Sequence, residues 1–264
     1  MLLDHEGLKD AESVRRAIAS GERLLEQGSR TITAAGDVVI KTGNRQAIER
    51  EARNIQFIAQ QTDLPVPKVY ACMDLDDRKT ALVMERIHGT TLQVAFHSLS
   101  EEEHTAVASQ MARYIDDLRQ HTLLNHFGCI DGGGFNDVLF DPPPGLAFAS
   151  GREFQDYWKL RFACSARPFD VSAVESILDR YADDNVGVLT HGDLATRNIM
   201  VNDGKIVGIL DWELAGYYPS CWEAIRMKWD VQAPLSWQKL LPDIMSMYHD
   251  QSIAYSWMLE VVCT

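Results

Sequence analysis

The sequence predicts an α+β fold with a small, sheet-rich N-terminal lobe and a mainly helical C-terminal lobe. At about 150 residues per domain, the 264 residues allow about two domains or one domain of two lobes. Strand patterns gather in the first third of the chain, and helical periodicity dominates after it. We therefore expect an N-terminal lobe over residues 1–88 and a C-terminal lobe over residues 89–264. Glu85–Gly89 would connect them, with Gly89 as the flexible joint.

The composition narrows the class of protein. Hydrophobic residues make up 46% and charged residues 24%, which is typical of a soluble globular chain. The formal net charge of −13 argues against binding of duplex DNA or an anionic lipid surface through bulk electrostatics. Such acidity would suit a cationic substrate, and it would equally serve solubility.

The location expected for the chain is the cytoplasm, without membrane attachment. No apolar run approaches the roughly 18 to 20 residues of a membrane span. The first residues, MLLDHEGLKD, lack the basic and apolar regions of a signal peptide. The five cysteines are scattered without a CxxC pair, which favours reduced thiols.

In the N-terminal lobe the elements expected, in chain order, are a strand over 36–42, a helix over 44–61, and strands over 69–73 and 80–87. Ile48, Ala52 and Ile55 recur at spacings of three and four, so they share one face of the helix. Leu64–Pro67 (LPVP) ends the helix, and a polar turn joins the last two strands.

The C-terminal lobe contains two capping-box patterns, Ser100–Glu103 and Ser172–Glu175, each of which predicts the start of a helix. The other elements expected are a strand over 186–190, a tight hairpin over 199–210 and a helix over 222–229. The glycine-rich Asp131–Gly134 is predicted to be a turn.

The segment most informative about chemistry is His191–Asn198 (HGDLATRN), which precedes an apolar strand that ends at Asp211. A hairpin brings its two outer ends together, so Asn198 and Asp211 should face each other across one site. Amide and carboxylate oxygens are suitable ligands for a hard divalent cation. Asp193 would stand beside the metal as an acid or a base.

At these residues the chain resembles the aminoglycoside phosphotransferase and choline kinase-like families, which share the protein-kinase architecture. The pattern His-Gly-Asp-Leu-x-x-x-Asn, followed by an apolar strand and Asp-Trp-Glu, carries the resemblance. Gly216–Pro219 and Trp222–Glu223 are similar to fungal-type members. The resemblance implies a two-lobed protein kinase-like fold, with ATP and Mg²⁺ as cofactors.

The resemblance also implies a phosphate-binding pair in the N-terminal lobe. Lys41, in Val38–Lys41 (VVIK), matches the strand lysine that holds the α- and β-phosphates. Glu51 matches the helix glutamate that pairs with this lysine. Helix geometry favours Glu51 over Glu49, because Glu51 lies about 60° and Glu49 about 100° from the apolar stripe.

For the C-terminal lobe, the resemblance implies that Asn198 and Asp211 hold Mg²⁺. Asp193 would orient the substrate hydroxyl and accept its proton late in the reaction. We expect His191 to brace this loop from behind. Arg197 would either supply extra charge or bind a neighbouring backbone group.

The adenine should lie along the inter-lobe strand, at Met84, Glu85 and Ile87. The stretch that corresponds to the phosphate loop, residues 27–36, has no Gly-x-Gly-x-x-Gly pattern. Ser29 and Thr31 are its candidates for phosphate contacts, through hydroxyl or backbone N–H groups.

The expected function is an ATP- and Mg²⁺-dependent phosphotransferase that acts on a small-molecule hydroxyl, with no nucleic-acid or membrane partner. Ala195 stands where protein kinases carry lysine, which favours a small acceptor. The acidic residues Glu213, Glu223 and Asp230 would either receive a cationic amine or form a solvated helix face. The alternative function is a pseudokinase that binds nucleotide without turnover.

Overall fold

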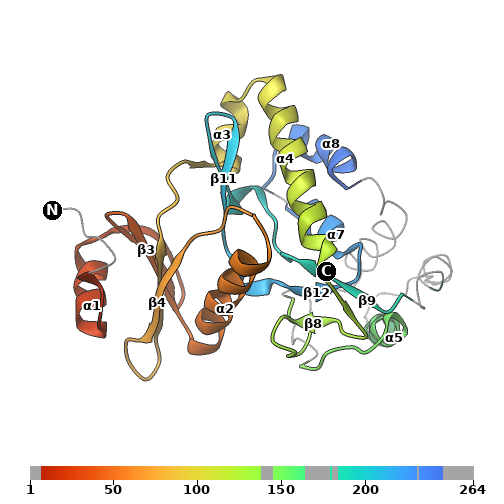
Figure 1. Ribbon diagram of the computed structural model, residues 1–264, viewed down its shortest axis with the longest axis horizontal. Helices are drawn as coiled ribbons and strands as arrows, with labels where there is room; N and C mark the ends of the chain where they lie inside the picture. The colour runs from red at the N-terminus through yellow and green to blue at the C-terminus, as the bar shows by residue number, and fades with distance from the viewer. Residues whose placement is uncertain (1–6, 138–144, 164–178, 180–183, 231, 246–264) are drawn as a thin grey trace. The chain divides into compact units, whose positions relative to one another are not determined.

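The computed structural model describes residues 7–137, 145–163, 179, 184–230 and 232–245, and the chain divides into two compact units (Figure 1). The first unit contains Met1–Thr90 together with Ile199–Glu213. The second contains Thr91–Asn198 and Leu214–Thr264. The helix predicted to begin at the Ser172–Glu175 capping box lies outside the described residues.

A five-stranded antiparallel sheet forms most of the first unit, in the order β1-β2-β3-β5-β4. Its strands are β1 (Glu22–Gln27), β2 (Arg30–Ala35), β3 (Val38–Gly43), β4 (Val69–Asp74) and β5 (Thr80–Glu85). The last three were predicted. The hairpin of β1 and β2 was not, because β1 is an edge strand whose residues are all exposed, so its sequence shows no polar–apolar alternation.

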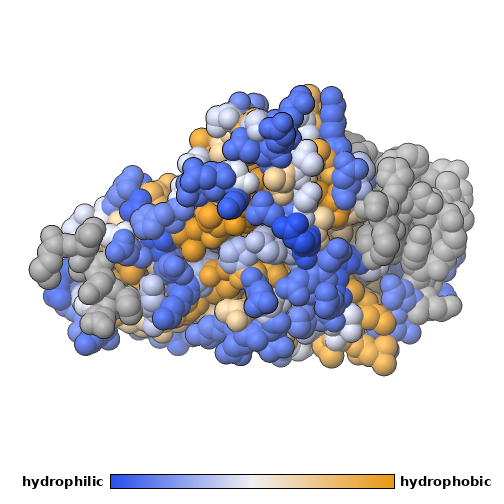
Figure 2. All heavy atoms as spheres, turned by 45° about the horizontal axis from the view of Figure 1, so that its top comes forward, coloured by the Kyte–Doolittle hydropathy of each residue, from blue (hydrophilic) through white to orange (hydrophobic). Residues whose placement is uncertain are grey.

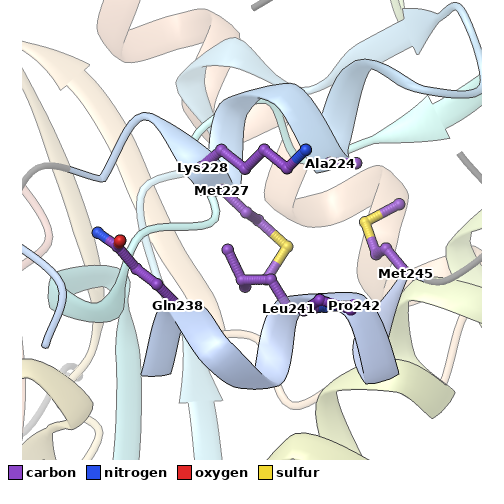
Figure 3. A pocket seen from close by; sticks show the side chains of 7 residues that line it. All are labelled: Ala224, Met227, Lys228, Gln238, Leu241, Pro242 and Met245. Atoms are coloured by element: carbon purple, nitrogen blue, oxygen red, sulfur yellow. The ribbon is translucent and has the colours of Figure 1, made fainter. Parts of the chain in front are cut away.

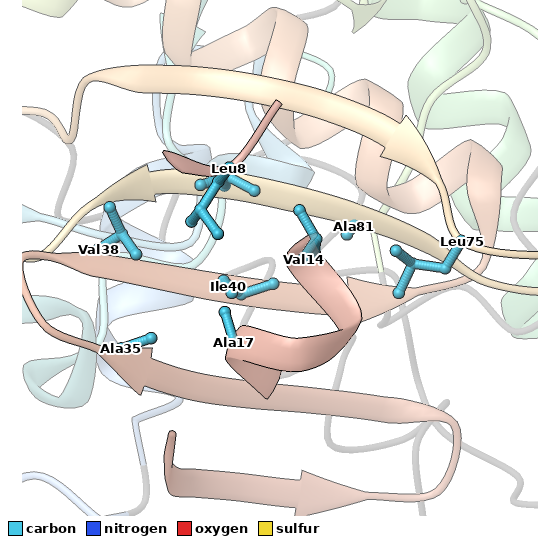
Figure 4. Close-up of a cluster of buried hydrophobic side chains, with 9 residues drawn as sticks. Leu8, Val14, Ala17, Ala35, Val38, Ile40, Leu75 and Ala81 are labelled. Carbon is cyan, nitrogen blue, oxygen red and sulfur yellow. The ribbon is translucent and has the colours of Figure 1, made fainter. Parts of the chain in front are cut away.

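Helix α1 (Ala11–Ser20) packs on the sheet and encloses the core of the first unit (Figure 4). Asp10 and Ser13 form a reciprocal capping box at its start. Val14 and Ala17 face Ile40 and neighbouring apolar side chains in one buried cluster. This helix was not predicted from the sequence.

Helix α2 (Arg45–Gln61) matches the prediction for residues 44–61 closely. The Asn44 side chain caps it by accepting a hydrogen bond of 2.9 Å from the Ala47 N–H. The helix packs against β3, β4 and β5 with an apolar stripe that includes Ile48 and Ile55. Two polar residues, Glu51 and Asn54, are also buried on this helix.

The predicted hairpin is present as β10 (Ile199–Asn202) and β11 (Lys205–Ile209), and it belongs to the first unit. The short strand β6 (Thr90–Thr91) extends it in the order β11-β10-β6. The Ile209 N–H donates to the Pro65 carbonyl at 2.8 Å, which ties the hairpin to the segment after α2. A Cβ at Gly89 would lie 2.7 Å from the Val201 carbonyl oxygen, so close backbone approach requires glycine there.

In the second unit, helices accompany a four-stranded sheet in the order β7-β9-β12-β8. The strands are β7 (Thr122–Leu124), β8 (Gly128–Cys129), β9 (Val186–Thr190) and β12 (Gly216–Tyr218). The helices of at least four residues in the described part of this unit are α3 (Leu92–Ala95), α4 (Glu101–Gln120), α5 (Gly151–Ala163), α7 (Trp222–Lys228) and α8 (Leu235–Ile244). Helix α4 begins at the predicted capping box and packs on β9 and α8.

Aromatic side chains dominate the core of the second unit. Phe135 contacts the Tyr218 ring edge to face at a centroid distance of 4.7 Å, and it contacts Trp222 at 5.4 Å. Phe154 contacts the same tryptophan at 5.5 Å. Trp222 is fully buried, so it is a core residue that fixes the position of α7.

No helix among the described residues is long and apolar enough to cross a membrane. In the view of Figure 2, polar side chains cover most of the described surface, and apolar side chains occupy smaller patches. Isolated exposed apolar residues, such as Val94 and Leu235, are ordinary for a folded chain.

A pocket of about 250 Å³ lies between α7 and α8 (Figure 3). Met227 and Leu241 point toward each other across it, and Lys228 and Gln238 are its polar members. None of the residues predicted to carry chemistry lines this pocket.

Candidate active site

The first unit contains a buried lysine that is held by two carboxylates. Lys41 lies on β3, where it pairs with Ile32 of β2 and Leu82 of β5, so it is central in the sheet. Its Nζ lies 2.7 Å from Oε2 of Glu51, and the two side chains are 2% and 1% exposed. The structure thus brings together the two residues that the resemblance paired, whereas Glu49 is only half-buried on α2.

Asp211 is the second partner of this lysine, although it lies 170 residues further along the chain. It follows β11, and its Oδ1 accepts a hydrogen bond of 2.8 Å from Lys41 Nζ. Its φ of 65° is left-handed, a conformation that aspartate tolerates better than most residues. A non-glycine residue held in this conformation is typical of functional sites.

Burial and charge oppose each other in this cluster. Burial alone would lower the pKa of Lys41, but Glu51 and Asp211 raise it above its ordinary value, so the ammonium stays charged. Burial raises the pKa of the Glu51 carboxyl, and the Lys41 charge counteracts that rise. The lysine therefore presents a fixed positive charge at this point of the sheet.

The first unit also gathers carboxylate oxygens that could hold a cation. One oxygen each from Glu51, Asp211 and Glu213 lie within 4.8 Å of one another. This donor set, oxygen only and partly open at Asp211, fits the chemistry of Mg²⁺. Of the two predicted metal ligands, Asp211 belongs to this unit, and Asn198 belongs to the second.

The residues predicted near the adenine lie at the end of β5 and just beyond it. Met84 is buried and pairs with Val39 and Val69. The Glu85 N–H donates to the Lys68 carbonyl at 2.8 Å, so this donor is already used. Ile87 is half-buried. Their part in nucleotide binding stays a prediction.

The residues predicted to contact phosphate differ in their surroundings. Ser29 is exposed in the turn between β1 and β2. Thr31 is buried, and its hydroxyl lies 2.7 Å from the Thr42 hydroxyl. Because Thr31 pairs with Thr42 and side chains alternate along a strand, Thr31 faces away from the side of the sheet that carries Lys41.

Asp193 lies in the second unit, in the loop that follows β9, and three contacts hold its side chain. Its Oδ2 accepts hydrogen bonds from Arg197 at 2.5 Å and from the Asn198 amide at 3.0 Å. Its Oδ1 lies 3.3 Å from a guanidinium nitrogen of Arg226. The backbone carbonyl of Asp193 also accepts from the Asn198 amide, at 2.8 Å. The side chain is 20% exposed, so it is fixed and still open to solvent.

The backbone of this loop is braced from inside the unit. His191 is fully buried, and its Nδ1 accepts a hydrogen bond of 3.1 Å from the Asp193 N–H, as expected for a bracing residue. Gly192 has a φ of 81°, and a Cβ there would lie 2.9 Å from the Leu214 carbonyl oxygen. The loop geometry therefore requires glycine at this position.

Glu223, on α7, anchors the same loop. Its Oε2 accepts the His191 N–H at 2.6 Å and the Gly192 N–H at 3.4 Å. Burial raises the pKa of this carboxyl to about 7, and the two N–H groups and Arg226 partly offset the rise. Among the described residues, its other oxygen accepts no hydrogen bond.

Arg226 and Asp230 complete the bracing. The Arg226 Nε donates to the Gly192 carbonyl at 2.7 Å and lies 3.4 Å from Asp137, which also accepts from the Trp222 indole at 2.8 Å. Asp230 accepts the backbone N–H of Thr196 at 2.7 Å and its hydroxyl at 2.8 Å.

These contacts correct the interpretation of the acidic residues after the hairpin. Glu223 and Asp230 are 3% and 5% exposed, so they neither form a solvated helix face nor await a cationic amine. They accept backbone N–H groups of the loop that carries Asp193. Arg197, for which two roles were open, binds the Asp193 carboxylate itself.

Sequence reasoning missed Glu223, Arg226 and Asp137 as parts of these networks, and it missed Arg30, which donates to Glu213 at 2.7 Å in the first unit. Each acts on a residue at least 32 positions away, and no local periodicity reports such a pairing. The available signal was charge, since Glu223 and Arg226 follow Trp222 in a helix whose other residues, apart from Lys228, are apolar.

Comparison with solved structures defines the class of fold. The fold is protein kinase-like, as in solved aminoglycoside phosphotransferases of low sequence identity. An ADP-bound APH(2'')-Ib structure has a TM-score of 0.63 at 15% identity, covering 98% of this chain and 86% of that one. The APH(4)-Ia structure has a TM-score of 0.62 at 18% identity, covering 95% and 87%.

A third solved structure, a putative aminoglycoside phosphotransferase from Ralstonia eutropha JMP134, has a TM-score of 0.56 at 20% identity. The alignment covers 97% of this chain and 86% of that one. Comparison with curated proteins gives no match. The model of the phosphotransferase enzyme family matches residues 25–258, so the chain belongs to that family.

Proposed function

We propose that the protein transfers the γ-phosphate of ATP, with Mg²⁺, to a hydroxyl group of a small molecule. The observation that carries the proposal is the buried Lys41, held by Glu51 at 2.7 Å and by Asp211 at 2.8 Å. Burying charges is costly, and apolar residues of similar volume are often at least as stabilising. A buried cation and its carboxylates are therefore better explained by a multiply charged ligand than by stability.

In this proposal the first unit binds the nucleotide phosphates. Lys41 contacts the α- and β-phosphates, and Glu51 fixes the direction of its ammonium. Asp211 would hold Mg²⁺, which when bound would neutralise charge on the nucleotide phosphates. Asn198, in the second unit, stays the second predicted ligand. The carboxylate oxygens gathered around Asp211 support this role.

Asp193 orients the acceptor. Phosphoryl transfer depends on positioning and charge neutralisation more than on covalent catalysis. Arg197, Arg226 and Asn198 hold its carboxylate in one orientation, which supports its role as the hydrogen-bond acceptor for the substrate hydroxyl. It takes the hydroxyl proton as the acceptor oxygen bonds to the γ-phosphorus and the bond from that phosphorus to ADP breaks.

A small acceptor fits the sequence around the site. Asp211 is followed directly by a short 3₁₀ helix (Trp212–Leu214) and β12, so the chain has no long segment here for a peptide substrate or for loop phosphorylation. Two structural relatives are described as complexes with an aminoglycoside, one with AMP-PNP and hygromycin B and one with GDP and kanamycin. We extend to this chain only the class, a small hydroxyl compound.

The test is a screen of amino alcohols, sugars and aminoglycosides with labelled ATP and Mg²⁺, followed by variants at Asp193. We expect Asp193→Ala to lower turnover by at least about 10²-fold, the scale of lost positioning and acid–base catalysis. ATP affinity should stay within about twofold of the parent.

Unchanged turnover in that variant would remove Asp193 from its assigned role. ATP binding without transfer to any acceptor, and without ATP hydrolysis, would favour the alternative of a nucleotide-binding protein that lacks turnover.

A further inference from the structure

The stretch that corresponds to the phosphate loop, residues 27–36, contains few of the groups that usually bind phosphate. Residues 27–36 contain only two glycines, Gly28 and Gly36, so they form no glycine-rich loop of backbone N–H donors. Thr31 bonds Thr42 on the other side of the sheet. Besides the proposed Mg²⁺, Lys41 is the cation that the proposed function assigns to a triphosphate, so a second side-chain cation would compensate for the missing glycine-rich loop.

Arg30 stands on the same face of the sheet as Lys41. Ile32 pairs directly with Lys41 across β2 and β3, and paired residues project to the same face. Arg30 precedes Ile32 by two residues, so strand alternation places its side chain on that face as well. The two cations are therefore diagonal neighbours on adjacent strands.

The structure shows what holds Arg30 in place. One guanidinium nitrogen lies 3.0 and 2.7 Å from the two carboxylate oxygens of Glu213, a residue 183 positions away. The Arg30 side chain is 35% and that of Glu213 is 16% exposed. Glu213 follows Asp211 by two residues and belongs to the same group of carboxylates.

Further electrostatic evidence indicates that Arg30 faces the whole carboxylate group. Burial alone would lower the pKa of the Arg30 guanidinium, but Glu213, Asp211 and Glu51 together raise it. The same carboxylates surround Lys41. Two cations and three carboxylates therefore form one alternating cluster within the first unit.

We propose that Arg30 is a second phosphate-binding cation, which serves in place of a glycine-rich loop, and that Glu213 holds it when no nucleotide is bound. This inference rests on the proposed function, because its ligand is the polyphosphate of a nucleotide. A planar guanidinium binds phosphate oxygens in the same paired geometry as a carboxylate, so phosphate can take the place of Glu213. The released carboxylate then adds to the oxygen donors beside Asp211.

A purely structural ion pair is the competing explanation. An exposed or half-exposed pair contributes little to stability. In that case, loss of Arg30 would lower the unfolding temperature slightly. Its effect on ligand affinity would not depend on the number of phosphates in the ligand. The two explanations therefore differ in ligand binding.

The first experiment measures the affinity of the full chain for ATP, ADP and adenosine by calorimetry, with and without Mg²⁺. We expect Arg30→Met to weaken ATP binding by about 10- to 100-fold, the scale of a lost charge-assisted hydrogen bond. Adenosine binding should change by less than about twofold. Arg23→Met is the matched control, since Arg23 is an exposed arginine on the neighbouring strand β1, and its ATP affinity should equal that of the parent.

The second experiment is a double-mutant cycle with Glu213→Gln in the absence of Mg²⁺. If Glu213 competes with phosphate for Arg30, Glu213→Gln strengthens ATP binding by at least about threefold in the parent. The same substitution should give no gain when Arg30 is already methionine. An equal gain in both backgrounds would mean that Glu213 acts only as a nearby negative charge, and it would overturn the holding role.

These outcomes separate the two proposals. A parent protein that binds neither ATP nor adenosine would end the proposed function, and this inference with it. A parent that binds ATP while Arg30→Met binds it equally well would overturn the role of Arg30 alone. Arg30→Lys serves as the second variant if the methionine variant does not fold, and it should recover part of the ATP affinity because it restores charge without the paired geometry.

Discussion

Replacing Glu223 by glutamine should make the protein less sensitive to alkaline pH. Glu223 is 3% exposed, and burial raises the pKa of its carboxyl from 4.5 to about 7. The unfolded chain therefore releases this proton at lower pH than the folded chain does. The stabilisation from this group is fully present below pH 4.5 and is lost as the pH rises through about 7.

The magnitude follows from the size of the shift. A shift from 4.5 to about 7, at 1.36 kcal/mol per pKa unit, corresponds to about 3 kcal/mol of unfolding free energy. Glutamine keeps a carbonyl oxygen for the His191 and Gly192 N–H groups, and it carries no charge. The stability of Glu223→Gln relative to the parent should thus rise by about 3 kcal/mol between pH 4.5 and pH 8.

Urea denaturation at a series of pH values, followed by tryptophan fluorescence, measures this difference. Other groups titrate equally in both proteins, so the difference between the two curves isolates Glu223. The exposed Glu102→Gln variant controls for the loss of one carboxylate. A difference between Glu223→Gln and the parent that stays constant from pH 4.5 to 8 would refute the reasoning, because it would mean that the buried carboxyl does not change its protonation in this range.

Three further predictions concern both units. Asp211→Asn should keep the left-handed backbone and lose the charge, so calorimetry should show at least about a tenfold smaller gain in ATP affinity on addition of Mg²⁺; an unchanged gain would remove Asp211 as a metal ligand. Lys41→Met leaves the Glu51 carboxylate buried without its cation and should cost about 3–5 kcal/mol in chemical denaturation; the double variant with Glu51→Leu should recover most of that loss, and no recovery would show that packing causes it. Gly192→Ala should lose at least about 1 kcal/mol of stability, because its φ is 81° and the new Cβ would meet the Leu214 carbonyl oxygen; a fully stable variant would show that the loop can relax.

The parts of the fold that could be predicted from the sequence are those whose signals are local. Helix α2 has a periodic apolar stripe and the Asn44 cap, and α4 has the capping box at Ser100. The hairpin β10–β11 has a short polar turn between two apolar strands. The strand β1 and the helix α1 were not predicted, because β1 is exposed throughout, and α1 begins at a capping box of Asp10 and Ser13, a pattern less distinctive than Ser-x-x-Glu.

The residues of the candidate site also fall into those with a local sequence signal and those without one. Lys41, Glu51, Asp193 and Asp211 stand in short motifs with defined spacing, so the sequence alone could nominate them. The residues that orient them could not be nominated, since Arg30 and Glu213 are brought together only by the fold. In the sequence, a buried acid such as Glu223 cannot be told from a surface residue. Its hydrogen-bond donors are backbone N–H groups, which every residue except proline carries, so no residue type marks them.

The first unit is built from two separate segments of the chain, and this affects how it folds during synthesis. About a hundred residues lie between Thr90 and the hairpin that completes this unit. During synthesis on the ribosome, the sheet and α2 would emerge early. The hydrogen bonds of the Pro65 carbonyl to Ile209 and of Lys41 to Asp211 could form only after the hairpin has been synthesised. Nascent chains stopped before residue 209 would therefore contain an incomplete first unit, without the Ile209 N–H that donates to the Pro65 carbonyl.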